Sequence, residues 1–178
     1  MGKIWRILLL LSVVTASGAL LADDDEDEHE GRRGGHRSSD LPVLTHAAWE
    51  TECSGCHMAY HPGLLPERSW RKLMDGLDKH FGENASLDDS VREDITRFLV
   101  ANSADHSSAR RSQKFAASIP ANSTPLRISE TRYFRAKHDE VKASVWKREK
   151  IGSPANCGAC HQGAKEGDFS EDRVSIPR

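Results

Sequence analysis

Two short motifs use all four cysteines of the chain. The first is CSGCH at residues 53–57, and the second is CGACH at residues 157–161. In both motifs two residues separate the cysteines, and a histidine follows the second cysteine directly. This feature constrains the fold most, because both segments must be held around whatever the cysteines bind.

Three chemistries commonly use paired cysteines. Disulfides would suit an exported protein, but they do not require a histidine after each pair. A zinc ribbon also uses C-x-x-C pairs, although these usually lie much closer together in the sequence. The remaining chemistry is c-type haem attachment, for which C-x-x-C-H is the signature. Two such motifs with no cysteine left over therefore predict two covalently bound c-type haems.

Helical spacing gives each residue of a motif a role. Residues at i, i+3 and i+4 share one face of a helix, so Cys53 and Cys56 are expected to bind the haem vinyl groups while His57 binds the iron. The second motif is expected to repeat this arrangement with Cys157, Cys160 and His161.

The N-terminus predicts export. Two basic residues, an apolar run and then small residues follow one another, in the order typical of a secretory signal peptide, which we assign to residues 1–22. The apolar run is too short to span a bilayer comfortably, which disfavours an uncleaved anchor. Residues 23–40 are acidic and then glycine-rich, and we interpret them as a disordered leader. A periplasmic location is therefore expected.

Hydrophobic periodicity predicts an all-α fold. Amphipathic helices are expected over residues 51–60, from Pro66 into His80, after a capping box formed by Ser86 and Asp89, and from Ser129 past Trp146. No stretch alternates with the period of two that strands show. We expect a first haem domain at residues 41–103, a linker with at most one helical turn at 104–128, and a second haem segment at 129–178. Large aliphatic residues are sparse, so haem surfaces are expected to complete the core.

The sixth ligand of each iron separates an electron carrier from a catalyst, because an open position admits a small molecule. His138 lies on the apolar face of its expected helix, and His80 extends the apolar face of the helix before it. These two are the strongest candidates. His61 follows His57 by one turn, so it could reach only the second haem.

The other candidates are weaker. His46 and His106 lie among polar residues and are expected to be solvated. Met58 and Met74 carry a thioether that can bind iron, but the helical spacing of Met74 favours packing.

Four stretches together resemble the small exported dihaem cytochrome c family. They are CSGCHMAYHPGLLPERSWRKLM, LDKHFGENASLDD, RISETRYFRAKHDE and the closing CGACH, and the resemblance covers residues 41–165. It implies a class I cytochrome c-like N-terminal domain, an irregular second haem segment, and two histidines on each iron. His80 and His138 would take the distal positions. The resemblance further implies electron donation to a high-spin monohaem cytochrome c and association with a membrane b-type cytochrome.

The charge distribution indicates a dipolar molecule without features of a nucleic-acid binder. Residues 40–103 carry 6 Lys and Arg against 11 Asp and Glu, a net charge of −5, whereas residues 104–178 carry 14 against 9, a net charge of +5. The two ends could orient the protein toward different redox partners, or the charges could serve solubility alone. The sequence thus predicts an electron-transfer protein rather than an enzyme; the alternative is a haem enzyme or gas-binding protein with one open iron.

Overall fold

The computed structural model describes residues 40–178, so the predicted signal peptide and nearly all of the predicted leader lie outside the described residues. Within residues 40–178 the chain is helical and contains no strand, which confirms the all-α prediction. No helix in this range is long and apolar enough to cross a membrane. Asp40, the last residue of the predicted leader, belongs to the fold: its carboxylate lies 2.6 Å from the Arg111 guanidinium.

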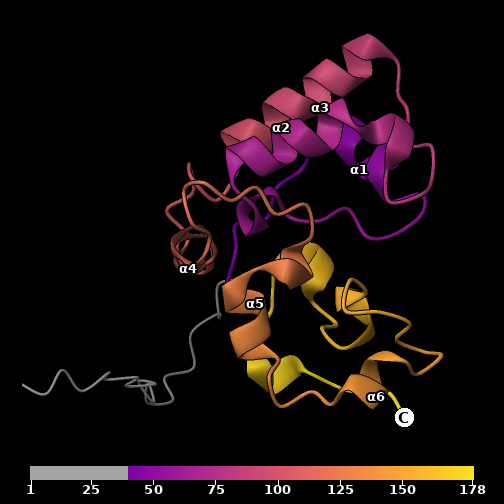
Figure 1. The fold of residues 1–178 in the computed structure, drawn as a ribbon, viewed down its shortest axis with the longest axis vertical. Coiled ribbons are helices and arrows are strands. Elements are labelled where there is room, and N and C mark those ends of the chain that lie inside the picture. Colours follow the sequence, from indigo (N-terminus) through magenta and orange to yellow (C-terminus); the bar gives the residue numbers. More distant parts are fainter. Residues whose placement is uncertain (1–39) are drawn as a thin grey trace, which may run out of the picture. The chain divides into compact units, whose positions relative to one another are not determined.

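Three helices build the first core: α1 (Ala47–Cys53), α2 (Glu67–Asp75) and α3 (Asp89–Ala101). Figure 1 shows α2 and α3 side by side, with α1 next to α3. The buried side chains come from all three helices and from the loop before α2: Trp49, Leu65, Trp70, Met74, Ile95 and Leu99. Trp70 and Met74 in α2 are four residues apart, as are Ile95 and Leu99 in α3, so each pair lies on one helix face. This spacing explains why the apolar pattern identified these helices.

The ends of these helices differ from the sequence prediction. Pro66 caps α2 instead of occupying its first turn, and α2 ends at Asp75 because Gly76 follows. The expected continuation to His80 is replaced by a 3-10 turn, η2 (Leu77–Lys79). The capping box does not form either, since Asp88 is the N-cap of α3 and makes no side-chain cap bond.

A helix lies where the sequence predicted a linker with at most one helical turn. This helix, α4 (Arg110–Ser118), buries Phe115, which packs with Leu41 and Leu64 in a second core. It contacts η1 (Pro62–Leu64) and the following helix, α5 (Arg132–Lys137). A single large apolar residue creates no periodicity, so only tertiary packing reveals this helix.

The long helix predicted from Ser129 past Trp146 is broken into three pieces. They are η3 (Ile128–Glu130), α5 (Arg132–Lys137) and α6 (Ala143–Trp146). Thr131 caps α5 by accepting a hydrogen bond from the Phe134 amide. α5 ends here because the His138 ring donates a hydrogen bond to the Phe134 carbonyl. In a continued α-helix the backbone amide of His138 would bond to that carbonyl.

The C-terminal part is irregular. It contains only the short turns η4 (Cys157–Ala159), η5 (Ala164–Glu166) and η6 (Glu171–Arg173). A backbone bond of 3.1 Å from Leu41 N–H to the Gly167 carbonyl ties it to the start of the described chain. Gly167 has a φ of 75°, and a Cβ there would lie 3.0 Å from Leu41, so this contact requires glycine.

His61 holds the start of the described chain against η1. Its Nε2–H donates to the Pro42 carbonyl at 2.9 Å, and its Nδ1 accepts from the Gly63 amide at 2.9 Å. The side chain is buried, and burial lowers the pKa of His61 despite the bond to Pro42. The neutral ring is therefore the form that the fold accommodates.

We expect Leu99→Ala to destabilise the folded protein strongly. Leu99 is 2% exposed in the first core, and truncating such a residue costs about 2–5 kcal/mol of unfolding free energy. Denaturant unfolding of the mature protein measures the loss. Val43→Ala is the control, because Val43 is 67% exposed and its truncation should cost about 0.5 kcal/mol or less. Equal losses would contradict the assignment of the core.

His61→Gln should change how stability depends on pH. The unfolded chain takes up a proton on His61 near its ordinary pKa, whereas the folded chain resists it, so the wild type should lose stability as the pH falls below that value. The variant should lose about 1–3 kcal/mol at neutral pH and show a shallower decline toward acid. Denaturant unfolding at a series of pH values tests this, with the half-exposed His106→Gln as control. Parallel pH profiles for the wild type and His61→Gln would contradict it.

Candidate haem-binding sites

The first cysteine motif lies at the end of a helix. α1 ends at Cys53 and residues 54–57 form a turn, so the helix predicted over residues 51–60 is wrong beyond Cys53. The Ser54 hydroxyl donates to the Glu50 carbonyl, and Gly55 follows, and both features disfavour further helix. Cys53 packs against the first core, while Cys56 is exposed.

The second motif forms one tight turn. The amides of Cys160 and His161 both donate to the Cys157 carbonyl, at 3.2 and 2.9 Å. These two bonds close a single turn around the cysteine pair. The three residues of the motif are therefore close together even though only η4 is helical here.

Within residues 40–178 no disulfide joins any of the four cysteines. Burial raises the pKa of Cys53 and of Cys157 to about 11, and burial also raises the pKa of Cys160. Thiols of this kind are protonated near neutral pH and exchange slowly with disulfides.

The histidine of the first motif faces His80. The centres of the His57 and His80 rings are 6.2 Å apart, and the ring planes are inclined by 31°. His80 follows η2, so the turn after α2 carries it to this position. Burial lowers the pKa of His80, and the neighbouring His57 and Arg127 lower it further. The ring is thus kept neutral, the form in which histidine binds metals.

A strained turn follows His80. The Glu83 amide donates to the His80 carbonyl at 3.1 Å, and the two residues between them have positive φ, 53° at Phe81 and 105° at Gly82. Phenylalanine is costly in this region of φ. The Arg127 guanidinium lies 3.8 Å over the Phe81 ring, and the Phe81 ring is edge-on to His80 at 4.8 Å. Together these contacts fix the direction of the His80 side chain.

The histidine of the second motif lies opposite His138 at nearly the same distance but with a different ring orientation. The centres of the His138 and His161 rings are 6.1 Å apart, with planes at 76°. Aromatic rings flank this pair: Phe134 stacks on His138 at 4.0 Å, and Phe169 is edge-on to His161 at 5.4 Å. Burial lowers the pKa of His161, as does the neighbouring His138.

The ring nitrogens show which histidines are available to a metal. His57 Nδ1–H donates to the Met58 carbonyl, and His138 Nδ1–H donates to the Phe134 carbonyl, both at 2.8 Å. A backbone bond at one ring nitrogen is typical of metal-binding histidines, because it leaves the other nitrogen as the ligand. In residues 40–178 no hydrogen bond to the Nε2 atom of His57 or His138 is seen. His161 Nδ1 is buried and likewise has no hydrogen-bond partner in this range.

The remaining described histidines are engaged elsewhere. His46 caps α1 through Nδ1, and its Nε2 lies 3.1 Å from Asp94. Both nitrogens of His61 bond to the backbone, which leaves none for a second iron. His106 pairs with Glu67 at 3.0 Å on the surface. His46 and His106 thus contact carboxylates rather than being simply solvated side chains.

Each pair of facing histidines fits a metal held between two imidazoles. With metal–nitrogen bonds of about 2 Å, two rings on opposite sides of one ion have their centres about 6 Å apart. The observed separations of 6.2 and 6.1 Å agree with this value. The aromatic side chains around both pairs also suit a large apolar ring. The two histidine pairs and the adjacent cysteine pairs therefore fit two haems.

Two further observations concern other candidate ligands. Met74 is 4% exposed within the first core, so it packs as its spacing indicated. Within residues 40–178 no group of three or more His, Cys, Asp or Glu side chains is arranged to hold a bare metal ion.

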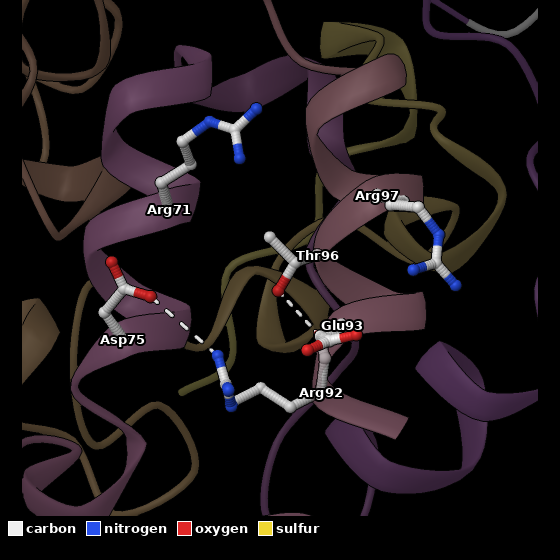
Figure 2. Close-up of a pocket in the computed structure, with 6 residues that line it drawn as sticks. All are labelled: Arg71, Asp75, Arg92, Glu93, Thr96 and Arg97. Carbon is white, nitrogen blue, oxygen red and sulfur yellow. Dashed lines mark hydrogen bonds and ion pairs between the residues drawn. The ribbon is translucent and has the colours of Figure 1, made fainter. Parts of the chain in front are cut away.

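A surface hollow between α2 and α3 has a different character. Figure 2 shows its lining, which comes only from these two helices: Arg71, Asp75, Arg92, Glu93, Thr96 and Arg97. Arg92 reaches Asp75 at 3.9 Å across the hollow, and the Thr96 hydroxyl donates to the Arg92 carbonyl at 2.6 Å. A charged lining of this kind does not suit a haem, and no cysteine or histidine contributes to it.

Sequence reasoning missed two side chains near the histidine pairs. The Tyr60 ring lies 4.8 Å from the His57 ring, and its hydroxyl donates to the Ala155 carbonyl at 2.8 Å. Arg127 lies over Phe81 although the sequence placed it in a linker. Both residues lie in stretches that carry the family resemblance, but neither has the spacing of a metal ligand, so the sequence did not indicate these contacts.

Comparisons with known proteins agree on one family. Residues 49–169 match the family described as Dihaem cytochrome c. A solved structure of a diheme cytochrome c from Rhodobacter sphaeroides is 48% identical, with a TM-score of 0.66 over 72% of this chain and 100% of that one. A diheme cytochrome type c from Shewanella baltica OS155 is 37% identical, with a TM-score of 0.60 over 74% of this chain and 92% of that one. No curated protein gave a significant match.

The family match covers more than half of the chain, and the R. sphaeroides structure is matched along its whole length. The paired cysteines, the facing histidines and these matches agree. The chain therefore belongs to the dihaem cytochrome c family, which carries out haem-based electron transfer with two c-type haems.

Proposed function

We propose that this protein is a periplasmic electron carrier in which both haems are low-spin and each iron is held by two histidines. The observation that carries the proposal is the pairing of each motif histidine with one other histidine about 6 Å away. The first haem would be held by Cys53, Cys56, His57 and His80, and the second by Cys157, Cys160, His161 and His138.

The side chains around each pair support this role. Haem supplies the ferric and ferrous states of the redox couple. Backbone bonds at His57 and His138 orient these rings, and burial favours the neutral forms of His80 and His161. A ring that is already neutral and oriented needs little rearrangement to remain a ligand in both oxidation states.

An enzyme or gas-binding protein would need one open iron position. Both histidine pairs supply a candidate for every axial position, which favours electron transfer over catalysis. His61 and His46 do not offer alternative ligands, because their ring nitrogens are already bonded.

The location and the partners are proposed on other grounds. The signal-like N-terminus supports export to the periplasm. The opposite net charges of residues 40–103 and 104–178 support two docking ends, one for an electron donor and one for an acceptor. A high-spin monohaem cytochrome c and a membrane b-type cytochrome are the proposed partners, because the resemblance to the exported dihaem family implies both.

Haem stoichiometry tests the attachment residues. Intact-mass measurement of the matured protein should show two haems, and the double variant Cys53→Ala, Cys56→Ala should retain one, because its second motif is unchanged. The matched double variant Cys157→Ala, Cys160→Ala should retain the other. Loss of no haem in either variant would overturn the attachment assignment.

Carbon monoxide binding tests the closed irons. The ferrous wild type should bind carbon monoxide slowly or not at all near neutral pH, whereas His80→Gly should expose one iron and convert about half of the haem to a carbon monoxide-binding form. Optical spectroscopy follows both reactions, and His106→Gly serves as the control because His106 lies on the surface. Rapid binding by the wild type would favour the enzyme or gas-binding alternative.

A further inference from the structure

Tyr60 connects the two haem-attachment segments directly. At one end its ring lies 4.8 Å from the ring of His57, with the planes inclined by 31°. At the other end its hydroxyl donates to the carbonyl of Ala155 at 2.8 Å, a contact between residues 95 positions apart. One side chain thus spans from the histidine of the first motif to the residue two positions before the second motif.

The acceptor of this bond is itself part of the second site. The Cys157 amide donates to the same Ala155 carbonyl at 3.0 Å, and the Cys157 thiol lies 3.6 Å from it. The Ala155 amide is held in turn by the Ser153 hydroxyl at 3.2 Å. Tyr60 and the first residue of the second motif, Cys157, therefore bond to the same carbonyl oxygen.

The first end of Tyr60 is firmly seated. Its ring is partly buried against the first core. A tyrosine ring has only two side-chain torsions, so an anchored ring fixes the position of its hydroxyl. Near neutral pH the phenol keeps its proton and can act as the donor.

We propose that Tyr60 is a positioning residue that sets the separation of the two haem-attachment segments, and with it the electrostatic interaction between the two haems. This inference rests on the proposed attachment of haem to both motifs. Reduction of one haem adds a negative charge, and the resulting shift in the potential of the other haem depends on their separation. A rigid link between the segments keeps that shift constant.

The test compares Tyr60→Phe with Tyr133→Phe in the mature protein carrying both haems. The first variant keeps the ring against His57 and removes only the bond to Ala155. Tyr133 is a matched control, because it packs by its ring, edge-on to Phe115 at 4.9 Å. Hydrogen exchange of the peptide covering residues 153–161 should become about 2- to 12-fold faster in Tyr60→Phe, the change expected from one hydrogen bond, and should not change in Tyr133→Phe.

Redox titration measures the reduction potentials of the two haems, which would not change if the bond had only a structural role. Electron paramagnetic resonance can follow the two ferric haems separately while the potential is varied. Reduction of one haem shifts the reduction potential of the other. In Tyr60→Phe this shift in potential should be smaller than in the wild type, and in Tyr133→Phe it should have the wild-type size. If hydrogen exchange of residues 153–161 became faster but the shift in reduction potential did not change, the positioning role would be wrong. It would also be wrong if hydrogen exchange in Tyr60→Phe equalled that in Tyr133→Phe.

Failure of this inference can be distinguished from failure of the proposed function. Intact mass reports the two attached haems, and the spin state reports the two histidines on each iron. Both should be the same in Tyr60→Phe as in the wild type. If both are unchanged and the exchange and the shift are unchanged as well, the positioning role of Tyr60 is wrong while the proposed function stands.

Discussion

Two pairs of histidines, each with ring centres about 6 Å apart, are the constraint on which the rest of this structure depends. In both pairs the histidines are 23 positions apart, but their order differs: His57 precedes His80, whereas His161 follows His138. The first pair is brought together by α2 and its terminal turn. The second pair is brought together by short turns, which succeed because hydrogen bonds and aromatic contacts hold them in place.

The bonding of the ring nitrogens separates the histidines into two groups. His61 and His46 use both nitrogens, so they serve the fold by tethering a segment and capping a helix. His57 and His138 use one nitrogen on a backbone carbonyl, which orients the ring and leaves Nε2 without a hydrogen bond among the described residues. Histidine thus serves either to stabilise the fold or as a candidate ligand, depending on which backbone and side-chain groups bond to its ring nitrogens.

The two cores of the described chain differ in size. The first core contains two tryptophans and several aliphatic side chains from three helices. The second core has only three buried apolar residues, one from the start of the described chain, one from η1 and one from α4. With so little apolar area, the C-terminal turns depend on long-range contacts such as the 3.1 Å bond from the Phe169 amide to the Asp40 carboxylate and the bond between Leu41 and Gly167. A haem held by the second motif would add apolar surface to this part of the chain.

The sequence alone determined the cofactor chemistry and the helical class. Both follow from local patterns: C-x-x-C-H is contiguous, and the spacing of Trp70 and Met74, or of Ile95 and Leu99, follows directly from the period of a helix. It also ranked His80 and His138 above the other histidines, in agreement with the ring geometry, although their role as ligands remains a proposal. Only the tertiary structure decided where α1 and α5 end, that α4 forms, and that Tyr60 reaches the second motif. The packing of α4 and the reach of Tyr60 depend on contacts between residues far apart in the sequence, which no local pattern records. α1 and α5 end where the side chains of Ser54 and His138 bond carbonyls four residues earlier, which helical periodicity does not indicate.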